Sequence, residues 1–237
     1  MKSIVYLLIL QIISIVSAFT LQQPRSLTKT TLRSSPSSIE ELLESDKWAI
    51  IKEELDHVPV FSCANEQGQP LQYNVGGGPI AFFFCDIDAA NKELEKAKLE
   101  TKLPGLTLLP FPLGEVFQMG AKQMGVVIPS AEALEGAGAP EGLNPIGQQV
   151  PLFGCMEIQA DKADGTSMTP LFFTKGEAEE AMNMALEGAG ASGDDSKFQV
   201  SIMPLVKAVQ QMSTNENQSF IFEAPKSSLE YLRNFMK

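Results

Sequence analysis

Short apolar runs and amphipathic stretches follow each other along this chain in an order that occurs twice. The matching pairs are residues 58–63 (VPVFSC) and 150–155 (VPLFGC), Phe83-Phe84 and Phe172-Phe173, Pro112-Leu113 and Pro204-Leu205, and residues 125–134 and 220–229. Solenoid repeats have periods of about 20–50 residues, and this period is longer. The pattern therefore predicts two copies of one small α/β unit, packed together with a shared apolar groove between two similar walls.

Within each copy, the pattern predicts strands that alternate with amphipathic helices. The apolar runs predict strands at residues 58–63, 80–85, 106–111 and 126–128, and again at 150–158, 169–173, 198–203 and 220–222. The run at 80–85 is wholly apolar, as in strands that are covered on both faces. The helix starts are predicted from capping residues, namely Asp86 or Asp88, Ser130, Thr174 with Glu177, and Ser227 with Glu230. The predicted fold is α/β (α+β), with two pseudo-symmetric repeats that each combine a small sheet with flanking helices in a two-lobed domain.

The N-terminal segment is predicted to lie outside this fold. Residues 1–18 combine Lys2, an apolar stretch and small residues at the end, which is typical of a secretory signal peptide. Residues 19–37 are basic, rich in Ser and Thr and free of acidic residues, as organelle transit peptides are. The Ala18-Phe19 junction resembles the processing site of plastid preproteins in algae with complex, red-derived plastids. We expect entry through the ER and onward import into a plastid, with a secreted protein as the alternative.

The remaining chain divides into an amphipathic helical segment at residues 38–56, a first repeat at 57–145 and a second repeat at 146–237. Residues 1–37 hold four of the 18 basic residues and none of the 29 acidic ones, so the remainder has a formal charge of −15. Nucleic acid binding requires clusters of Lys and Arg, and this charge argues against it. The acidity favours solubility, or attraction to basic partners such as transit peptides.

Motifs that carry chemistry are weak in this sequence. Cys63, Cys85 and Cys155 lack the spacing of zinc ligands, and His57 is the one histidine, so a zinc site and a catalytic base are both disfavoured. Residues 188–193 match GxGxxG, but a helix precedes them and a strand follows, the reverse of the dinucleotide-binding context. Asn217 begins a glycosylation sequon. We expect no catalytic residue, no metal and no cofactor.

Several segments together resemble a known family, the twenty-two-kilodalton component of the translocon at the inner envelope of chloroplasts (Tic). The residues that carry the resemblance are 57–63 (HVPVFSC), 79–84 (PIAFFF), 111–119 (FPLGEVFQM), 149–155 (QVPLFGC), 169–181 (TPLFFTKGEAEEA) and 227–232 (SSLEYL). It covers the chain from about Trp48 to the C-terminus. The Gly/Ala-rich loops depart from the family pattern.

This resemblance implies a chaperone-like factor, without enzymatic activity, in an intermembrane space of the plastid envelope. Its partners would be unfolded preproteins, transit peptides and other translocon subunits, and its contact with membranes would be peripheral at most. Apolar pockets of the family would correspond to Phe83, Phe111, Phe117, Phe153, Phe172 and Phe173. Met119 and Met184 lie off the main apolar stripes of their helices, and we add Met119 to the predicted client-binding residues because methionine adapts to varied partners.

Two alternatives stay open at this point. One is a redox or other enzyme of the plastid periphery that uses Cys63 and Cys155, which occupy equivalent repeat positions and could form a disulfide after passage through the ER. The other is a purely structural scaffold, in which the chain's own side chains fill the grooves. The same apolar residues would then be core residues, and none of them would contact a client.

Overall fold

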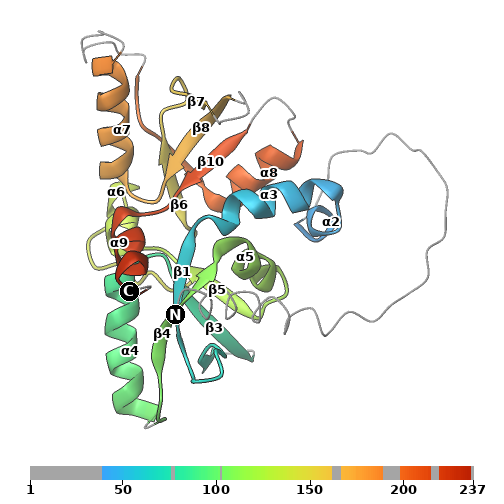
Figure 1. The fold of residues 1–237 in the computed structure, drawn as a ribbon, viewed down its shortest axis with the longest axis vertical. Coiled ribbons are helices and arrows are strands. Elements are labelled where there is room, and N and C mark those ends of the chain that lie inside the picture. The colour runs from blue at the N-terminus through green and yellow to red at the C-terminus, as the bar shows by residue number, and fades with distance from the viewer. Residues whose placement is uncertain are drawn as a thin grey trace, which may run out of the picture.

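The computed structural model describes residues 39–75, 78–101, 103–161, 167–188, 198–214 and 219–235. The predicted signal and transit peptides, Asn217 and nearly all of the GxGxxG match lie outside these ranges. The described chain is a mixed α/β fold with two sheets and flanking helices, which confirms the predicted class (Figure 1). No helix in the described ranges combines the length and the apolar character that crossing a bilayer requires.

The first sheet contains five strands in which β3 and β1 are central. Its strands are β1 (Pro59–Ala64), β2 (Gln72–Asn74), β3 (Pro79–Phe84), β4 (Thr107–Pro112) and β5 (Gly125–Ile128). Its helices are α4 (Ile87–Thr101), α5 (Leu113–Ala121) and α6 (Ala131–Gly136). Strand β1 runs antiparallel to β3 and β4, while β5 runs parallel to β3.

The second sheet repeats this topology strand by strand. Its strands are β6 (Pro151–Gly154), β7 (Ala160–Asp161), β8 (Ser167–Phe172), β9 (Ser201–Pro204) and β10 (Phe220–Glu223). Its helices are α7 (Lys175–Gly188), α8 (Leu205–Thr214) and α9 (Lys226–Phe235). Here β6 runs antiparallel to β8 and β9, and β10 runs parallel to β8, as their counterparts do.

The repeat extends to the register of the strands. Phe61 lies opposite Phe84 in the first sheet, and Phe153 lies opposite Phe172 in the second. The amide of Leu113 donates to the carbonyl of Val58 over 3.0 Å, and the equivalent bond from Leu205 to Val150 measures 2.9 Å. The duplication predicted from the sequence is therefore present in the backbone, although the boundaries at 57–145 and 146–237 stay a prediction.

The third helix of each repeat packs on the other repeat. Helix α6 lies against β6, where Ala133 and Ala137 join the cluster around Phe153. Helix α9 lies against β1 and α4, where Tyr231 meets the ring of Phe61 edge-on at a centroid distance of 5.3 Å. Helices α4, α9, α6 and α7 therefore line one side of the molecule (Figure 1). This exchange ties the two lobes together.

The other side of both sheets is covered by α5, α8 and an N-terminal helix that has no counterpart in the repeat. The N-terminal segment forms α2 (Ile39–Leu43) and α3 (Asp46–Asp56), with a short break between them. Trp48 of α3 packs on Phe117 of α5 at 5.7 Å between ring centroids, and the Nζ of Lys47 donates to the carbonyl of Ser213 at the end of α8. Helix α3 thus seals the junction of the two repeats.

Three local predictions need correction. The strand predicted at 150–158 ends at Gly154, and the strand predicted at 198–203 begins at Ser201. Helix α9 begins at Lys226, one residue before Ser227, so Ser227 is not its cap. The cap is supplied by a residue far away in the sequence, Glu177, whose carboxylate accepts the amide of Lys226 over 2.8 Å. A local sequence pattern cannot reveal a cap that comes from another helix.

Candidate functional site

Five of the seven predicted client-binding residues are buried. Phe83, Phe111, Phe117 and Phe173 belong to one apolar cluster, which we call the shared core, and Phe153 lies in a separate cluster under α6 and α7. The rings of Phe83 and Phe111 meet edge-on at 5.3 Å. A buried side chain contacts a client only if the core opens, so in this conformation these five residues stabilise the fold.

The shared core takes the place of the predicted groove. It contains residues of both sheets together with α3, α5 and α8, among them Val60 and Phe83 from the first sheet and Leu152 and Phe173 from the second. The apolar walls of the two lobes therefore meet each other and α3, and the chain's own side chains fill the space between them. Client binding by the seven residues stays a prediction, and of these only Phe172 and Met119 are partly exposed.

The opposite faces of the two sheets, which we call the outer faces, differ in how much of their surface is covered. On the first outer face, α4 covers Leu108 of β4 and Leu106, the residue just before β4, and both leucines are buried. On the second, α7 packs mainly over β6 and β8. Val200 and Phe172 are partly exposed there, and Ile202 of β9 is 49% exposed.

We take three residues of the second outer face, Phe172, Val200 and Ile202, as the candidate client-binding surface. Ile202 shares this face with Phe153 because the two residues lie directly opposite each other in the antiparallel pair β6–β9. Of these residues, the sequence analysis named Phe172 and Phe153 but missed Val200 and Ile202. The pattern of the chain did not signal this exposure, because it depends on packing: α7 takes the place of α4 but packs mainly over β6 and β8, whereas α4 also covers β4. Met184, predicted as an exposed apolar residue, is 66% exposed on α7.

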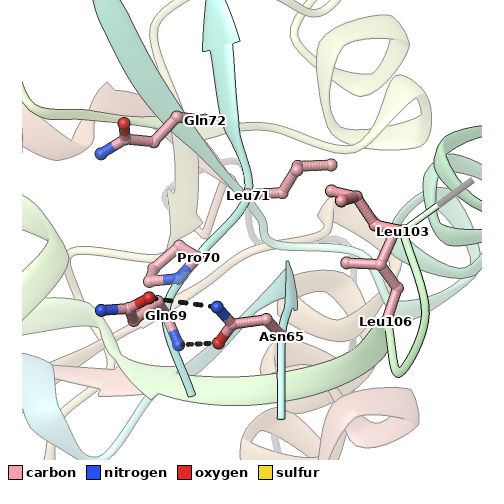
Figure 2. Close-up of a pocket in the computed structure, with 7 residues that line it drawn as sticks. All are labelled: Asn65, Gln69, Pro70, Leu71, Gln72, Leu103 and Leu106. Carbon is pink, nitrogen blue, oxygen red and sulfur yellow. Dashed lines mark hydrogen bonds between the residues drawn. The ribbon is translucent and has the colours of Figure 1, made fainter. Parts of the chain in front are cut away.

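A cavity of about 520 Å³ lies at the far end of the first repeat (Figure 2). Leu71, Leu103 and Leu106 form one wall, and the turn between β1 and β2 forms the other. Within that turn, the side-chain oxygen of Asn65 accepts the amides of Gln67 and Gln69 over 3.0 and 2.9 Å. The lining is apolar or neutral, so the cavity offers space for an apolar group and no acid or base.

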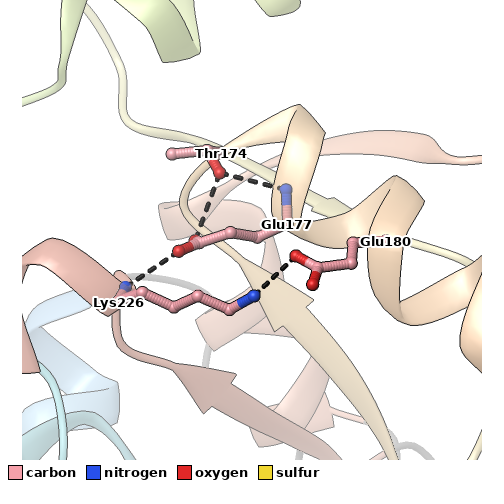
Figure 3. A network of polar contacts seen from close by, with 4 residues as sticks. All are labelled: Thr174, Glu177, Glu180 and Lys226. Carbon is pink, nitrogen blue, oxygen red and sulfur yellow. Dashed lines mark hydrogen bonds and ion pairs between the residues drawn. The ribbon is translucent and has the colours of Figure 1, made fainter.

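A polar network joins the start of α7 to the start of α9 (Figure 3). The hydroxyl of Thr174 donates to one oxygen of Glu177 over 3.1 Å and accepts the Glu177 amide over 3.3 Å, so Thr174 caps α7 as predicted, with the Glu177 carboxylate bonded to its hydroxyl. The second oxygen of Glu177 accepts the amide of Lys226. The Nζ of Lys226 donates to Glu180, which raises the lysine's pKa. The network fixes α9 where it leaves the second repeat.

The three cysteines are buried and free. Burial, together with the nearby carboxylate of Glu93, raises the pKa of Cys63 to about 11, and burial raises that of Cys85 to about 12. The pKa of Cys155 is raised by burial and by its hydrogen bond to Glu157. Redox catalysis needs an accessible thiolate, so these thiols disfavour the redox alternative. His57 caps the end of α3, as expected of a helix-end histidine.

No protein-family model matches the chain, and neither does any curated protein sequence. Among solved structures, the chain is similar to Tic22 from Plasmodium falciparum, with a TM-score of 0.61 and 19% sequence identity over 78% of this chain and 96% of that one. It is also similar to Anabaena Tic22, described as a protein of protein transport, with a TM-score of 0.61 and 18% identity over 79% and 96% of the two chains. The two-lobed arrangement of repeats described above is thus a Tic22-like fold.

Proposed function

We propose that this protein is a chaperone-like, non-enzymatic factor of preprotein import into plastids that binds extended client polypeptides. The observation that carries the proposal is the likeness of fold to two Tic22 proteins along nearly their whole length. One of these proteins is described by its role in protein transport. The raised pKa values of the buried thiols add support, because they weaken the competing redox interpretation.

The second outer face is the surface that we assign to the client. Its partly exposed apolar residues offer contact area without a demand for a particular sequence. Burial of apolar area contributes about 25 cal/mol per Å², from which the costs of ordering the client are subtracted. A small surface of this kind gives weak and reversible binding, which suits a factor that must release its client.

We place the protein in an intermembrane space of the plastid envelope, reached through the ER by the bipartite presequence of residues 1–18 and 19–37. The support is compositional, since these residues lie outside the described structure. Fusion of residues 1–37 to a fluorescent reporter tests it. We expect plastid-associated fluorescence, while fluorescence in the secretory pathway would contradict the assignment.

A structural scaffold of the translocon is the second candidate. The filled shared core favours it, because the groove between the lobes holds the chain's own side chains. The scaffold would assemble with other translocon subunits and would leave unfolded clients unbound. Client binding therefore separates the two candidates.

The direct test uses residues 38–237, which contain every described element, and a fluorescent peptide with the sequence of residues 19–37. We expect binding at micromolar concentrations, and suppression of the aggregation of an unfolded client. Ile202→Ser should weaken both effects about fivefold, because it removes apolar contact of roughly 1 kcal/mol.

The matched control is Ile146→Ser, since Ile146 is 43% exposed in the segment between the repeats. It removes a similar exposed side chain far from β9 in sequence and should leave binding unchanged. Polar variants of Phe117 are unsuitable, because Phe117 is buried in the shared core and its loss would destabilise the fold. Absence of binding at micromolar concentrations would reject the client-binding proposal and leave the scaffold.

A further inference from the structure

The edge strands β4 and β9 occupy equivalent places in the two sheets. Within the described residues, β4 pairs only with β1, and β9 pairs only with β6. An edge strand directs half of its backbone amides and carbonyls away from its sheet, where they can pair with another extended chain.

The register determines which groups of β9 point outward. The amide of Leu205 donates to the carbonyl of Val150, so residues 150 and 205 form a hydrogen-bonded pair. Hydrogen-bonded and non-bonded pairs alternate in an antiparallel ladder, which places Pro151–Pro204 and Phe153–Ile202 among the non-bonded pairs. The amide and carbonyl of Ile202 consequently point away from β6, toward the open edge of the sheet.

The equivalent position of β4 is blocked. Pro110 lies opposite Phe61, as Ile202 lies opposite Phe153, and the amide of Leu113 donates to Val58 in the same alternation. Residue 110 therefore also faces the open edge, but proline has no backbone N–H to donate. Proline at an edge is a known protection against strand addition. The first repeat has this protection at Pro110, whereas the second repeat has Ile202 at the equivalent position.

We infer that the edge of β9 at Ile202 binds an extended segment of a client polypeptide as an added strand. This inference rests on the proposed function and names the site and the mode of binding. Ile202 would exchange backbone hydrogen bonds with the client, while its side chain and that of Val200 would pack against alternate residues of the added strand.

The negative net charge of the chain favours a basic segment as the occupant of this edge. The chain has a formal net charge of −11, so a basic extended segment is attracted to it, whereas a second copy of the same chain is repelled. A suitable probe is the peptide of residues 25–35 (RSLTKTTLRSS), which has three basic residues, no acidic one and several β-branched threonines. It represents the basic, acid-free class of segment that the second outer face would hold.

The test compares Ile202→Pro with Ile202→Val in binding of the fluorescently labelled probe by anisotropy. Both variants keep an apolar side chain, but only proline removes the outward N–H. That N–H is not used within the sheet, and Pro110 shows that the fold accepts proline at this place, so thermal unfolding should stay close to that of the wild type. We expect I202P to bind at least tenfold more weakly, with I202V within twofold of the wild type.

A second experiment changes the probe peptide and leaves the protein unchanged. N-methylation of alternate backbone amides should abolish binding for one of the two alternating sets and leave it nearly unchanged for the other, because an added strand uses every second amide. Equal binding by wild type, I202V and I202P, or tolerance of both methylated sets, would overturn strand addition while the proposed function stands.

Two further outcomes distinguish failure of strand addition from failure of the proposed function. Failure of the wild type to bind the unmodified probe or any unfolded client would reject the proposed function together with the inference. A concentration-dependent dimer in sedimentation that I202P abolishes would show that a second copy occupies the edge, which would overturn the client as its occupant.

Discussion

The two outer faces are built on strands with the same order and register, yet they are covered to different degrees. Within the described residues, the cluster over the first outer face contains 11 buried residues of strands and helices together, and the cluster over the second contains three. The strands do not explain this difference, because Phe61 and Phe153 are both fully buried at equivalent positions. It arises from the helices above them and from the edge strand, where Leu106 and Leu108 are covered but Ile202 is not. The two copies of the duplicated sheet therefore differ in cover: the outer face is buried in the first lobe and partly exposed in the second.

The largest effect should come from truncating the aromatic residue at the centre of each outer face. Phe61→Ala leaves a cavity among β1, α4 and α9, and we expect a loss of about 4 kcal/mol in the free energy of unfolding. Phe153→Ala should cost about 3 kcal/mol, because the thinner cluster around it can collapse further into the space. Denaturant unfolding of both variants measures the difference. Equal losses would show that the two faces are packed alike.

A smaller effect is expected at the position that follows these aromatic residues. Ser62 has room for its side chain, but a Cβ on Gly154 would lie 2.7 Å from the carbonyl oxygen of Pro170 and 2.8 Å from Leu171. Gly154→Ser copies the first repeat into the second and should cost about 2 kcal/mol by overpacking. Ser62→Gly makes the reverse exchange and should cost about 1 kcal/mol through added backbone freedom. A neutral G154S would mean that β6 and β8 can separate without loss.

Helix α3 approaches α5 more closely than a side chain on residue 114 would allow. A Cβ on Gly114 would lie 2.9 Å from the carbonyl oxygen of Lys52 and 2.5 Å from Asp56. Lys52 itself pairs with Asp56 and Glu115 and holds the two helices together. Gly114→Ala should therefore cost about 1–2 kcal/mol despite the better helix propensity of alanine.

Gly176 is the matched control for Gly114. It is also the second residue of its helix, α7, and a Cβ there would meet no atom within 4 Å. Gly176→Ala should stabilise the protein by up to about 1 kcal/mol. If both alanine variants stabilise the protein in thermal or denaturant unfolding, the close approach of α3 to α5 has no energetic consequence.

Much of the fold follows from the sequence because the repeat supplies the same pattern twice. The strands around Phe61 and Phe153 and the cap of α7 by Thr174 are local signals that the structure confirms. The shared core takes the place of the predicted groove because an apolar run predicts burial without naming the partner. Whether Phe83 meets a client or another strand depends on α3, whose position is set by contacts distant in sequence. For the same reason, four of the seven residues predicted to bind clients lie in the shared core, and Ile202 was not among the residues predicted.

The smallest effect concerns Glu177, which has no acidic counterpart in the first repeat. There Asp86 caps α4 through the amide of Asp88 at 2.7 Å, and the cap ends with that helix. Glu177 accepts from Thr174 in its own helix and from the first amide of α9, so one carboxylate serves two positive helix ends. Glu177→Gln keeps the size but removes the charge, and should cost about 1 kcal/mol in denaturant unfolding, with a smaller loss at high salt. Glu180→Gln removes only an exposed ion pair with Lys226 and should cost less than Glu177→Gln. Equal effects of the two variants would show that the anchoring of α9 depends on its packing against the first repeat and not on this carboxylate.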